Sequence, residues 1–459
     1  MSFSVEELPW QDHTVIPAPL ARVDGTTWPQ EILSLAEQHL GVPYPIVIGH
    51  PGRVDAQVNS SGRIAGTIGC WAMHDPGNTG TTGNYYGVVL VVAGHHVSAE
   101  RVYLICEGMT SAIRLFVFNG FDELGQPVAY VPWYSERSGT SEPYDFDISG
   151  VYVWSTVDFD SASTYGLGHT PIADDFRNSS QPTTWVLWHD EEDDSRGGLQ
   201  VKGQTIRGAG DVLSYLLSLT TIQVDRGRWA AARATLNRYR LDFAIDALTS
   251  PWEFLKEHLL PILPVSLRHG PDGLYPVVWR FEATAADAVL ALDVDADPAI
   301  QREGRVVSDS SEILNDFSLG YAYSRKSQSF LGAVRLGAHA VSGSSTESPI
   351  LPDPRCRRSQ DRYPLATLAR ESRVIYETQT ARSVCSWWAA AYTAPRRTVS
   401  YLVPEAVACG IEAGAVVTLT DSTLHLSEQV CLVLDVQFDS TDQVGLVLRL
   451  LDSPHTWRQ

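Results

Sequence analysis

The spacing of apolar residues predicts that the first 205 residues are mainly strands. A helix is expected over 28–40, because apolar side chains recur there on one face and Gly41 ends the pattern. Residues 141–200 are expected to form long surface loops between short strands. Alternating or short apolar runs predict strands at 45–48, 86–92, 101–106 and 113–119, with the last pairing with 127–131 across a turn at 122–125.

A helical segment followed by strands is expected over residues 206–345. Asp211 is predicted to cap a helix, and a second helix is expected around 229–238. A third begins at Ser250 in a capping-box pattern, with Pro251 at its first position. The apolar stripe of the first helix is Val212, Leu213, Leu216 and Leu217. Strands are expected to resume at 277–281 and 317–323.

Residues 346–459 are expected to hold one helix and a strand-rich tail. A stretch rich in serine, glycine and proline over 342–354 predicts a loop or a seam between domains. The helix is expected around 381–392, and strands at 430–438 and 444–451 are expected to form a hairpin. One side of that helix carries Ala381, Val384, Cys385 and Trp388. At about 150 residues per domain, the length predicts three domains, 1–205, 206–345 and 346–459.

Charge narrows the classes of partner. The formal net charge is −20, from 34 Lys and Arg against 54 Asp and Glu, which argues against tight non-specific binding of nucleic acid. The charge is also unevenly distributed along the sequence. Residues 141–200 hold twelve acids and two arginines, whereas residues 353–397 hold nine arginines and four acids. No apolar run approaches the ~18–20 residues of a membrane span, and the N-terminus lacks the pattern of a secretion signal.

The usual catalytic motifs are not found. No phosphate-binding loop, nucleophile elbow or zinc-binding helix pattern occurs in the chain. Gly208-Ala209-Gly210 lacks the third glycine of a dinucleotide turn. His95 and His96 would point to opposite faces of a strand, so they are not expected to share a metal. The acidic cluster 189–194 lacks the spacing of a calcium loop and is expected to be a solvated loop.

Cysteines and tryptophans are assigned to packing first. The six cysteines form no close pair in sequence, so buried free thiols are expected. The thirteen tryptophans are expected in the core or at a subunit interface, although Trp185 and Trp188 beside the acidic cluster leave a sugar-stacking role open. At least one ring of Trp387 and Trp388 is expected in the core. We therefore assign no catalytic, cofactor-binding or metal-binding residue and expect no enzymatic activity.

Four features from residue 206 onward carry a family resemblance. They are 211–217 with 251–255 and 270–275 after it, the strand 315–321, the group 361–363 before the helix with Ala381 and Trp388, and 395–404 leading into 412–421. In this order they resemble the central hub proteins at the tail tip or baseplate of long-tailed bacteriophages. Ala415 departs from the pattern, since such proteins usually have Gly-Asp-Val-Val there.

The resemblance implies an α+β, mainly β, multidomain fold with β-barrel-like tube domains and a small helical domain. It implies a homotrimer whose two barrel-like domains per chain form a ring at the virion tail tip, after assembly in the bacterial host cytoplasm. Its partners would be a distal tail protein, a tape-measure protein and other tail-tip or fibre proteins, with DNA passing through unbound. The alternatives are a host-glycan-binding or carbohydrate-active tail protein, and the hexameric distal tail protein.

Overall fold

The computed structural model describes residues 46–51, 205–324, 328–340, 349–438 and 442–451 with their side chains. It also describes the backbone of the strands between residues 68 and 204. In this part of the chain no helix is long and apolar enough to cross a membrane. Several expected features lie outside the described residues, namely the helix 28–40, the strand 127–131, His95 and His96, and the cluster 189–194.

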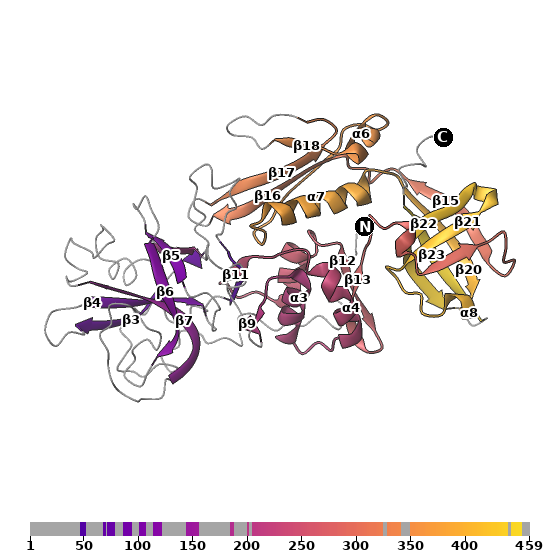
Figure 1. The fold of residues 1–459 in the computed structure, drawn as a ribbon. Coiled ribbons are helices and arrows are strands. Elements are labelled where there is room, and N and C mark those ends of the chain that lie inside the picture. The colour runs from indigo at the N-terminus through magenta and orange to yellow at the C-terminus, as the bar shows by residue number, and fades with distance from the viewer. Residues whose placement is uncertain are drawn as a thin grey trace.

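The N-terminal strands form one antiparallel sheet of seven strands, drawn in indigo and violet in Figure 1. Its order is β2 (Ile68–Gly69), β8 (Thr184–Leu187), β5 (Arg101–Cys106), β6 (Ile113–Phe121), β7 (Tyr144–Ser155), β4 (Tyr86–Ala93) and β3 (Trp71–Asn78). The strands predicted at 86–92, 101–106 and 113–119 are confirmed. β7 departs from the expected short strands, because it runs for 12 residues, of which Asp145 and Asp147 alternate with Phe146 and Ile148.

Helices follow the seven-stranded sheet and a short pair formed by β9 (Gln200–Val201) and β10 (Gln204–Thr205). α3 (Ala209–Ser218) and α4 (Arg226–Leu236) are confirmed, and the predicted apolar stripe of α3 is buried. The predicted cap was wrong, because Gly208 is the N-cap and Asp211 lies in the first turn. The helix starts earlier because the Ala209 N–H finds an acceptor outside it, the Tyr239 carbonyl, at 2.9 Å.

The third predicted helix begins as expected and then widens. The Ser250 hydroxyl accepts from the Glu253 N–H at 3.1 Å, and Pro251 is the first residue of α5 (Pro251–Phe254). The helix continues as the π-turn η2 (Leu255–Leu259) and ends before Pro261. A hairpin of β12 (Val265–Gly270) and β13 (Gly273–Val278) comes next. The strand predicted at 277–281 ends at Val278, earlier than expected. Trp279 and Phe281 leave the hairpin and pack against the C-terminal sheet.

A four-stranded sheet covers these helices, with one long helix between. Its order is β18 (Ile350–Pro352), β17 (Ser329–Gly337), β16 (Asp316–Ser324) and β19 (Thr367–Glu371). α7 (Thr378–Tyr392) lies along β16 and β17 and faces α3 (Figure 1), and α6 (Pro354–Gln360) packs beside it. The predicted stripe of α7 is buried. One apolar core joins α3, α4, α5, η2, β16, β17 and α7.

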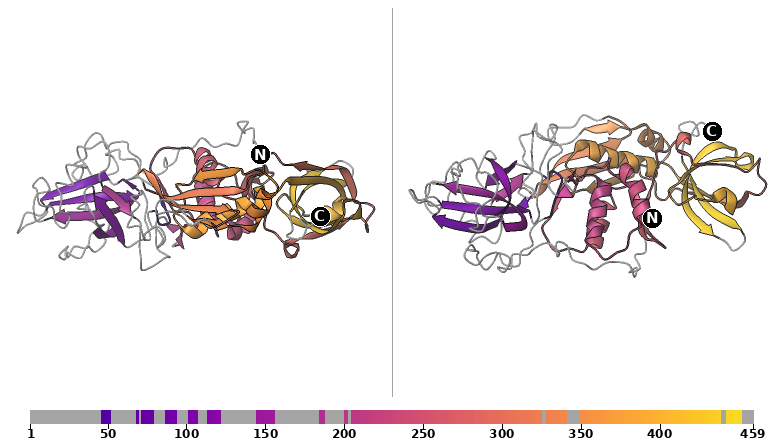
Figure 2. Two further views of the ribbon diagram at one scale, coloured as in Figure 1. Left: turned by 90° about the horizontal axis from the view of Figure 1, so that it is seen from above. Right: turned by 60° about the horizontal axis from the view of Figure 1, so that its bottom comes forward.

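The C-terminal sheet has six strands and its own core. Its order is β14 (Leu290–Asp293), β21 (Val416–Asp421), β22 (Leu426–Phe438), β23 (Gln443–Leu450), β20 (Arg396–Pro404) and β15 (Gln301–Asp309). The predicted hairpin is confirmed, with Phe438 opposite Val444. The sheet curls around its core (Figure 2), but its hydrogen-bonded order ends at β14 and β15, so no closed barrel is found in the described residues.

The chain is therefore a mainly-β α+β protein with several units, as predicted. Strand pairing crosses both predicted domain boundaries. β1 (Ile46–Ile48) pairs with β11 (Phe243–Ile245), which lies beyond residue 205. β14 and β15 join the C-terminal sheet across residue 345, and β16 and β17 pair with β19 and β18 across the same position. The division into 1–205, 206–345 and 346–459 stays a prediction.

Candidate functional site

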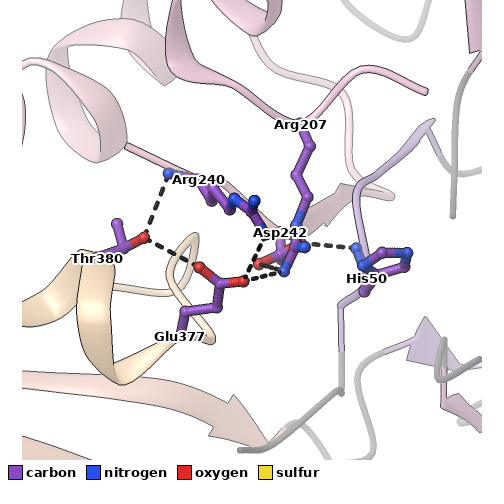
Figure 3. Close-up of polar contacts among 6 residues, drawn as sticks. All are labelled: His50, Arg207, Arg240, Asp242, Glu377 and Thr380. Carbon is purple, nitrogen blue, oxygen red and sulfur yellow. Dashed lines mark hydrogen bonds and ion pairs between the residues drawn. The ribbon is translucent and has the colours of Figure 1, made fainter. Parts of the chain in front are cut away.

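A cluster of charged side chains lies buried where several distant parts of the chain meet (Figure 3). His50 follows β1, Arg207 precedes α3, and Asp242 precedes β11. Glu377 is the N-cap residue of α7, so its carboxylate lies at the positive end of the helix dipole. We name Arg207, Asp242, Glu377 and the His50 backbone the ion cluster.

Asp242 is the centre of the ion cluster. Its side chain is 0% exposed and accepts three hydrogen bonds. Arg207 donates from Nε to Oδ1 at 2.7 Å and from Nη2 to Oδ2 at 3.1 Å, which is a bidentate pairing. The His50 backbone N–H donates to Oδ1 at 2.7 Å. One carboxylate therefore holds two chain segments that are far apart in sequence.

Glu377 extends the ion cluster toward solvent. Arg207 Nη2 donates to Glu377 Oε1 at 2.7 Å, so one guanidinium bridges two carboxylates. Arg240 Nη1 reaches the same oxygen at 3.4 Å from a side chain that is 50% exposed. Thr380 Oγ1 donates to Glu377 Oε2 at 3.4 Å and accepts from the Arg240 backbone N–H at 3.3 Å. These contacts tie the start of α7 to the segment between α4 and β11.

Gly49 allows the His50 backbone N–H to come within 2.7 Å of Asp242 Oδ1. Its φ is +63°, a conformation that glycine adopts without the strain of a Cβ. A Cβ at this position would lie 2.3 Å from Asp242 Oδ1 and 2.7 Å from the Leu241 carbonyl oxygen. Backbone hydrogen bonds hold Leu241 and Asp242 in place. The Leu241 N–H donates to the Arg207 carbonyl and the Asp242 N–H donates to the Val374 carbonyl, each at 2.9 Å.

The electrostatics of the ion cluster favour its charged form. Burial alone would raise the pKa of Asp242, but the charge and hydrogen bonds of Arg207 outweigh it and hold that pKa below its usual value. Burial likewise opposes the charge of Arg207, and Asp242 with Glu377 raises the pKa of Arg207 above its usual value. An ionised carboxylate with its oxygens engaged is a poor general base. The ion cluster is therefore suited to holding chain segments together and not to proton transfer.

A cavity of about 190 Å³ adjoins the ion cluster. Three aromatic rings form one wall of the cavity. The ring centroids of Phe243 and Phe254 are 5.1 Å apart, and those of Phe254 and His258 are 4.9 Å apart. Burial lowers the pKa of His258. Arg373 lies 4.5 Å from the centroid of the Tyr323 ring on another wall. No nucleophile paired with a base is found among the described residues that line this cavity.

Packing explains the glycines, cysteines and tryptophans that the sequence offered as candidate site residues, wherever the structure describes them. A Cβ on Gly208 would lie 2.5 Å from Asn237, and one on Gly210 would lie 2.9 Å from the Arg233 backbone, so these glycines allow α3 and α4 to pack closely. The buried free thiols are confirmed at Cys356, Cys385 and Cys431, whereas Cys409 is exposed. Both rings of the Trp387–Trp388 pair are buried. No group of three metal-binding side chains is found in the described part.

Sequence reasoning missed the ion cluster. Its signal is local and weak, because Arg207 and Asp242 each follow one apolar residue that is buried, Ile206 and Leu241. A charged residue in such a place is expected to have a partner. The partner itself could not be read from the pattern, since 192 residues separate His50 from Asp242.

Comparison with known proteins gives likenesses in fold only. No protein-family model matches the chain, and no curated protein sequence matches it. A chain in the virion of a native gene transfer agent particle is 12% identical, with 94% of this chain and 88% of that chain covered and a TM-score of 0.44. The 43 kDa tail protein of prophage MuSo2 from Shewanella oneidensis is 10% identical, with 80% and 99% covered and a TM-score of 0.31. The tail protein from Neisseria meningitidis MC58 is 11% identical, with 82% and 90% covered and a TM-score of 0.30.

Proposed function

We propose that the chain is a structural protein of a long-tailed phage tail, and specifically the hub that joins the tail tube to the tip. The observation that carries the proposal is the ordered series of sequence patterns between residues 211 and 421. Those patterns fall on α3, α5, β16, α7, β20 and β21. The first four of these elements share one apolar core, and the last two belong to the C-terminal sheet.

The chemistry of the described residues supports a role in assembly over catalysis. The ion cluster holds segments together and keeps its charges paired. The described cysteines other than Cys409 are buried, and burial raises the pKa of Cys356, Cys385 and Cys431 to about 12, so their reactive thiolate forms are scarce at neutral pH. We therefore propose that the protein acts through its surfaces and not through an active site.

Exposed apolar side chains on the C-terminal sheet support association between subunits. Val307 on β15 is 59% exposed, Phe438 at the end of β22 is 75% exposed, and Val289 beside β14 is 65% exposed. A neighbouring subunit that covered these side chains would remove their apolar surface from water. An obligate ring would need interfaces above roughly 2,000 Å². The excess of negative charge supports passage of DNA, because like charges keep its backbone from adhering.

Electron microscopy of the purified chain tests this proposal. We expect threefold rings with a central channel, and Val307→Asp is expected to shift the population to smaller particles. Ser308→Asp is the matched control, since it adds the same charge on an adjacent exposed residue without removing an apolar group. A monodisperse monomer at micromolar concentration would overturn the proposal, and hexamers would favour the distal tail protein. Release of sugar from bacterial cell-wall glycan would instead favour the carbohydrate-active alternative.

A further inference from the structure

The four-stranded sheet has one protected edge and one open edge. β18, at one end, has only three residues and includes Pro352, and α6 follows it directly. β19, at the other end, pairs with β16 alone among the described strands. Four of its five residues are exposed, and Leu365, just before it, is 66% exposed. No described strand occupies the outer edge of β19.

The backbone groups of β19 alternate between the sheet and the open edge. The Ser372 N–H donates to the Gly320 carbonyl at 2.8 Å, and the Ala366 carbonyl accepts from the Asp316 N–H at 3.2 Å. In a parallel ladder the residues that bond the neighbouring strand occur at every second position. The even-numbered residues of this stretch therefore bond β16. Thr367, Ala369 and Glu371 direct their N–H and C=O groups outward.

An aromatic cavity of about 370 Å³ borders this edge. Leu368 and Arg370 of β19 line it, which places the side chains of alternate residues of the strand on one wall. The Trp387 Nε1–H is already satisfied by the Ile262 carbonyl at 2.9 Å. The cavity therefore offers apolar walls beside two charged side chains, Glu312 and Arg370. Its remaining walls are Leu260, Pro261, Glu312, Leu314, Trp387, Trp388 and Tyr392.

Arginines lie at this aromatic cavity. Arg370 is part of its lining, together with one acid, Glu312, and Arg449 binds the chain beside Tyr392 on its wall. Arg449 is held in place, because it donates to the Ala391 carbonyl and lies 4.8 Å from the centroid of the Phe281 ring. Arg370 is exposed and has no carboxylate partner among the described residues. An occupant with negative charge would complement this surface.

We propose that an extended, acidic segment of a partner protein binds here by adding a strand beside β19. Main-chain hydrogen bonds to Thr367, Ala369 and Glu371 would hold the segment. An apolar side chain of the segment would enter the aromatic cavity, and its carboxylates would pair with Arg370. This is the recognition mode in which a sheet edge supplies affinity and a side-chain pocket supplies specificity.

Fluorescence anisotropy with a labelled peptide tests the proposal. The probe is the acetylated and amidated peptide Ser-Glu-Ser-Leu-Ser-Glu-Ser, in which the leucine and both acids lie on one face of an extended strand, and its control carries lysine in place of each acid. We expect the acidic peptide to bind at least about tenfold more tightly at physiological salt. Arg370→Glu is expected to weaken binding by about tenfold. Arg305→Glu, which changes an exposed arginine on β15, is the matched control and is expected to leave binding unchanged.

The strand-addition geometry has its own test. N-methylation of alternate peptide amides blocks hydrogen bonds on one edge of the peptide only. We expect one set of methylated amides to abolish binding and the other set to leave it within about twofold. Ala369→Pro removes an outward N–H while keeping the ladder to β16, so it is expected to weaken binding with an unchanged melting temperature.

Three results would overturn the proposal of an acidic partner segment. The first is equal binding of the acidic and lysine peptides, and the second is equal binding of the two methylated peptides. The third is a dimer of the chain alone that Ala369→Pro dissociates, since a second copy would then occupy the edge. None of these results depends on whether the chain forms a threefold ring, so this test is separate from that of the proposed function.

Discussion

Replacing Asp242 with asparagine removes one buried charge and keeps the shape of the side chain. The carboxylate accepts from the His50 N–H and from two nitrogens of Arg207. The asparagine could keep two of these bonds at its oxygen, but its NH₂ group would face the Arg207 Nη2 donor. Removing one partner of a buried ion pair costs about 3–5 kcal/mol, because the other charge is left without compensation. We expect a loss in unfolding free energy within that range.

The assay is urea denaturation together with hydrogen exchange of the peptide that contains residues 46–51. Exchange in this peptide should rise in Asp242→Asn, because the His50 N–H loses its charged acceptor and β1 is freed to separate from β11. The matched control is Arg240→Gln, which removes the outer pair at 3.4 Å from a half-exposed arginine. That change is expected to cost less than about 1 kcal/mol.

A cost of Asp242→Asn below about 1 kcal/mol would refute the reasoning, because a clamp of this geometry should not be so weak. The same conclusion would follow if exchange at 46–51 stayed at the wild-type rate while the rest of the protein was destabilised. A double replacement, Arg207→Met with Asp242→Leu, should cost less than the sum of the single changes, since it removes both charges together.

Three further predictions follow from described contacts. The pKa of Asp242 is lowered in the fold, so its stabilisation is complete above about pH 5, beyond the unfolded pKa of about 4, and is lost as pH falls through the folded value. Melting temperatures of wild type and Asp242→Asn should therefore converge on acidification. Gly210→Ala should destabilise by about 1–3 kcal/mol in urea titrations through contact with the backbone of α4, whereas Gly227→Ala, with 3.5 Å to its nearest contact, should be neutral or stabilising. Peptide mapping after thiol alkylation at pH 8 should show exposed Cys409 labelled well before buried Cys431.

Elements with a strong apolar period could be predicted from the sequence. α7 was located because one face carries Ala381, Val384 and Trp388, and all three are buried. The β22–β23 hairpin was located because its apolar residues alternate by twos around a turn. In these elements the local pattern and the tertiary contacts favour the same structure.

β15 shows why other elements could not be predicted. Eight of the nine residues of Gln301–Asp309 are exposed, so no apolar alternation marks the strand. It forms because β20 offers a ladder to one side, which is a property of the fold and not of the segment. The ion cluster was missed for the same reason. Its members come from four separate stretches, and only the folded chain brings His50, Arg207 and Asp242 together.

The ion cluster lies where both ends of the N-terminal sheet region connect to the rest of the protein. His50 precedes the seven strands and Arg207 follows them, yet both bind the carboxylate of Asp242. The residues that flank the stretch 52–204 therefore meet at one buried carboxylate. A domain joined through a single linker can swivel about it, whereas a stretch held at both ends by one carboxylate has fewer ways to reorient. Breaking the clamp should thus loosen both connections at once, and we infer that Asp242 sets how firmly the N-terminal sheet is held.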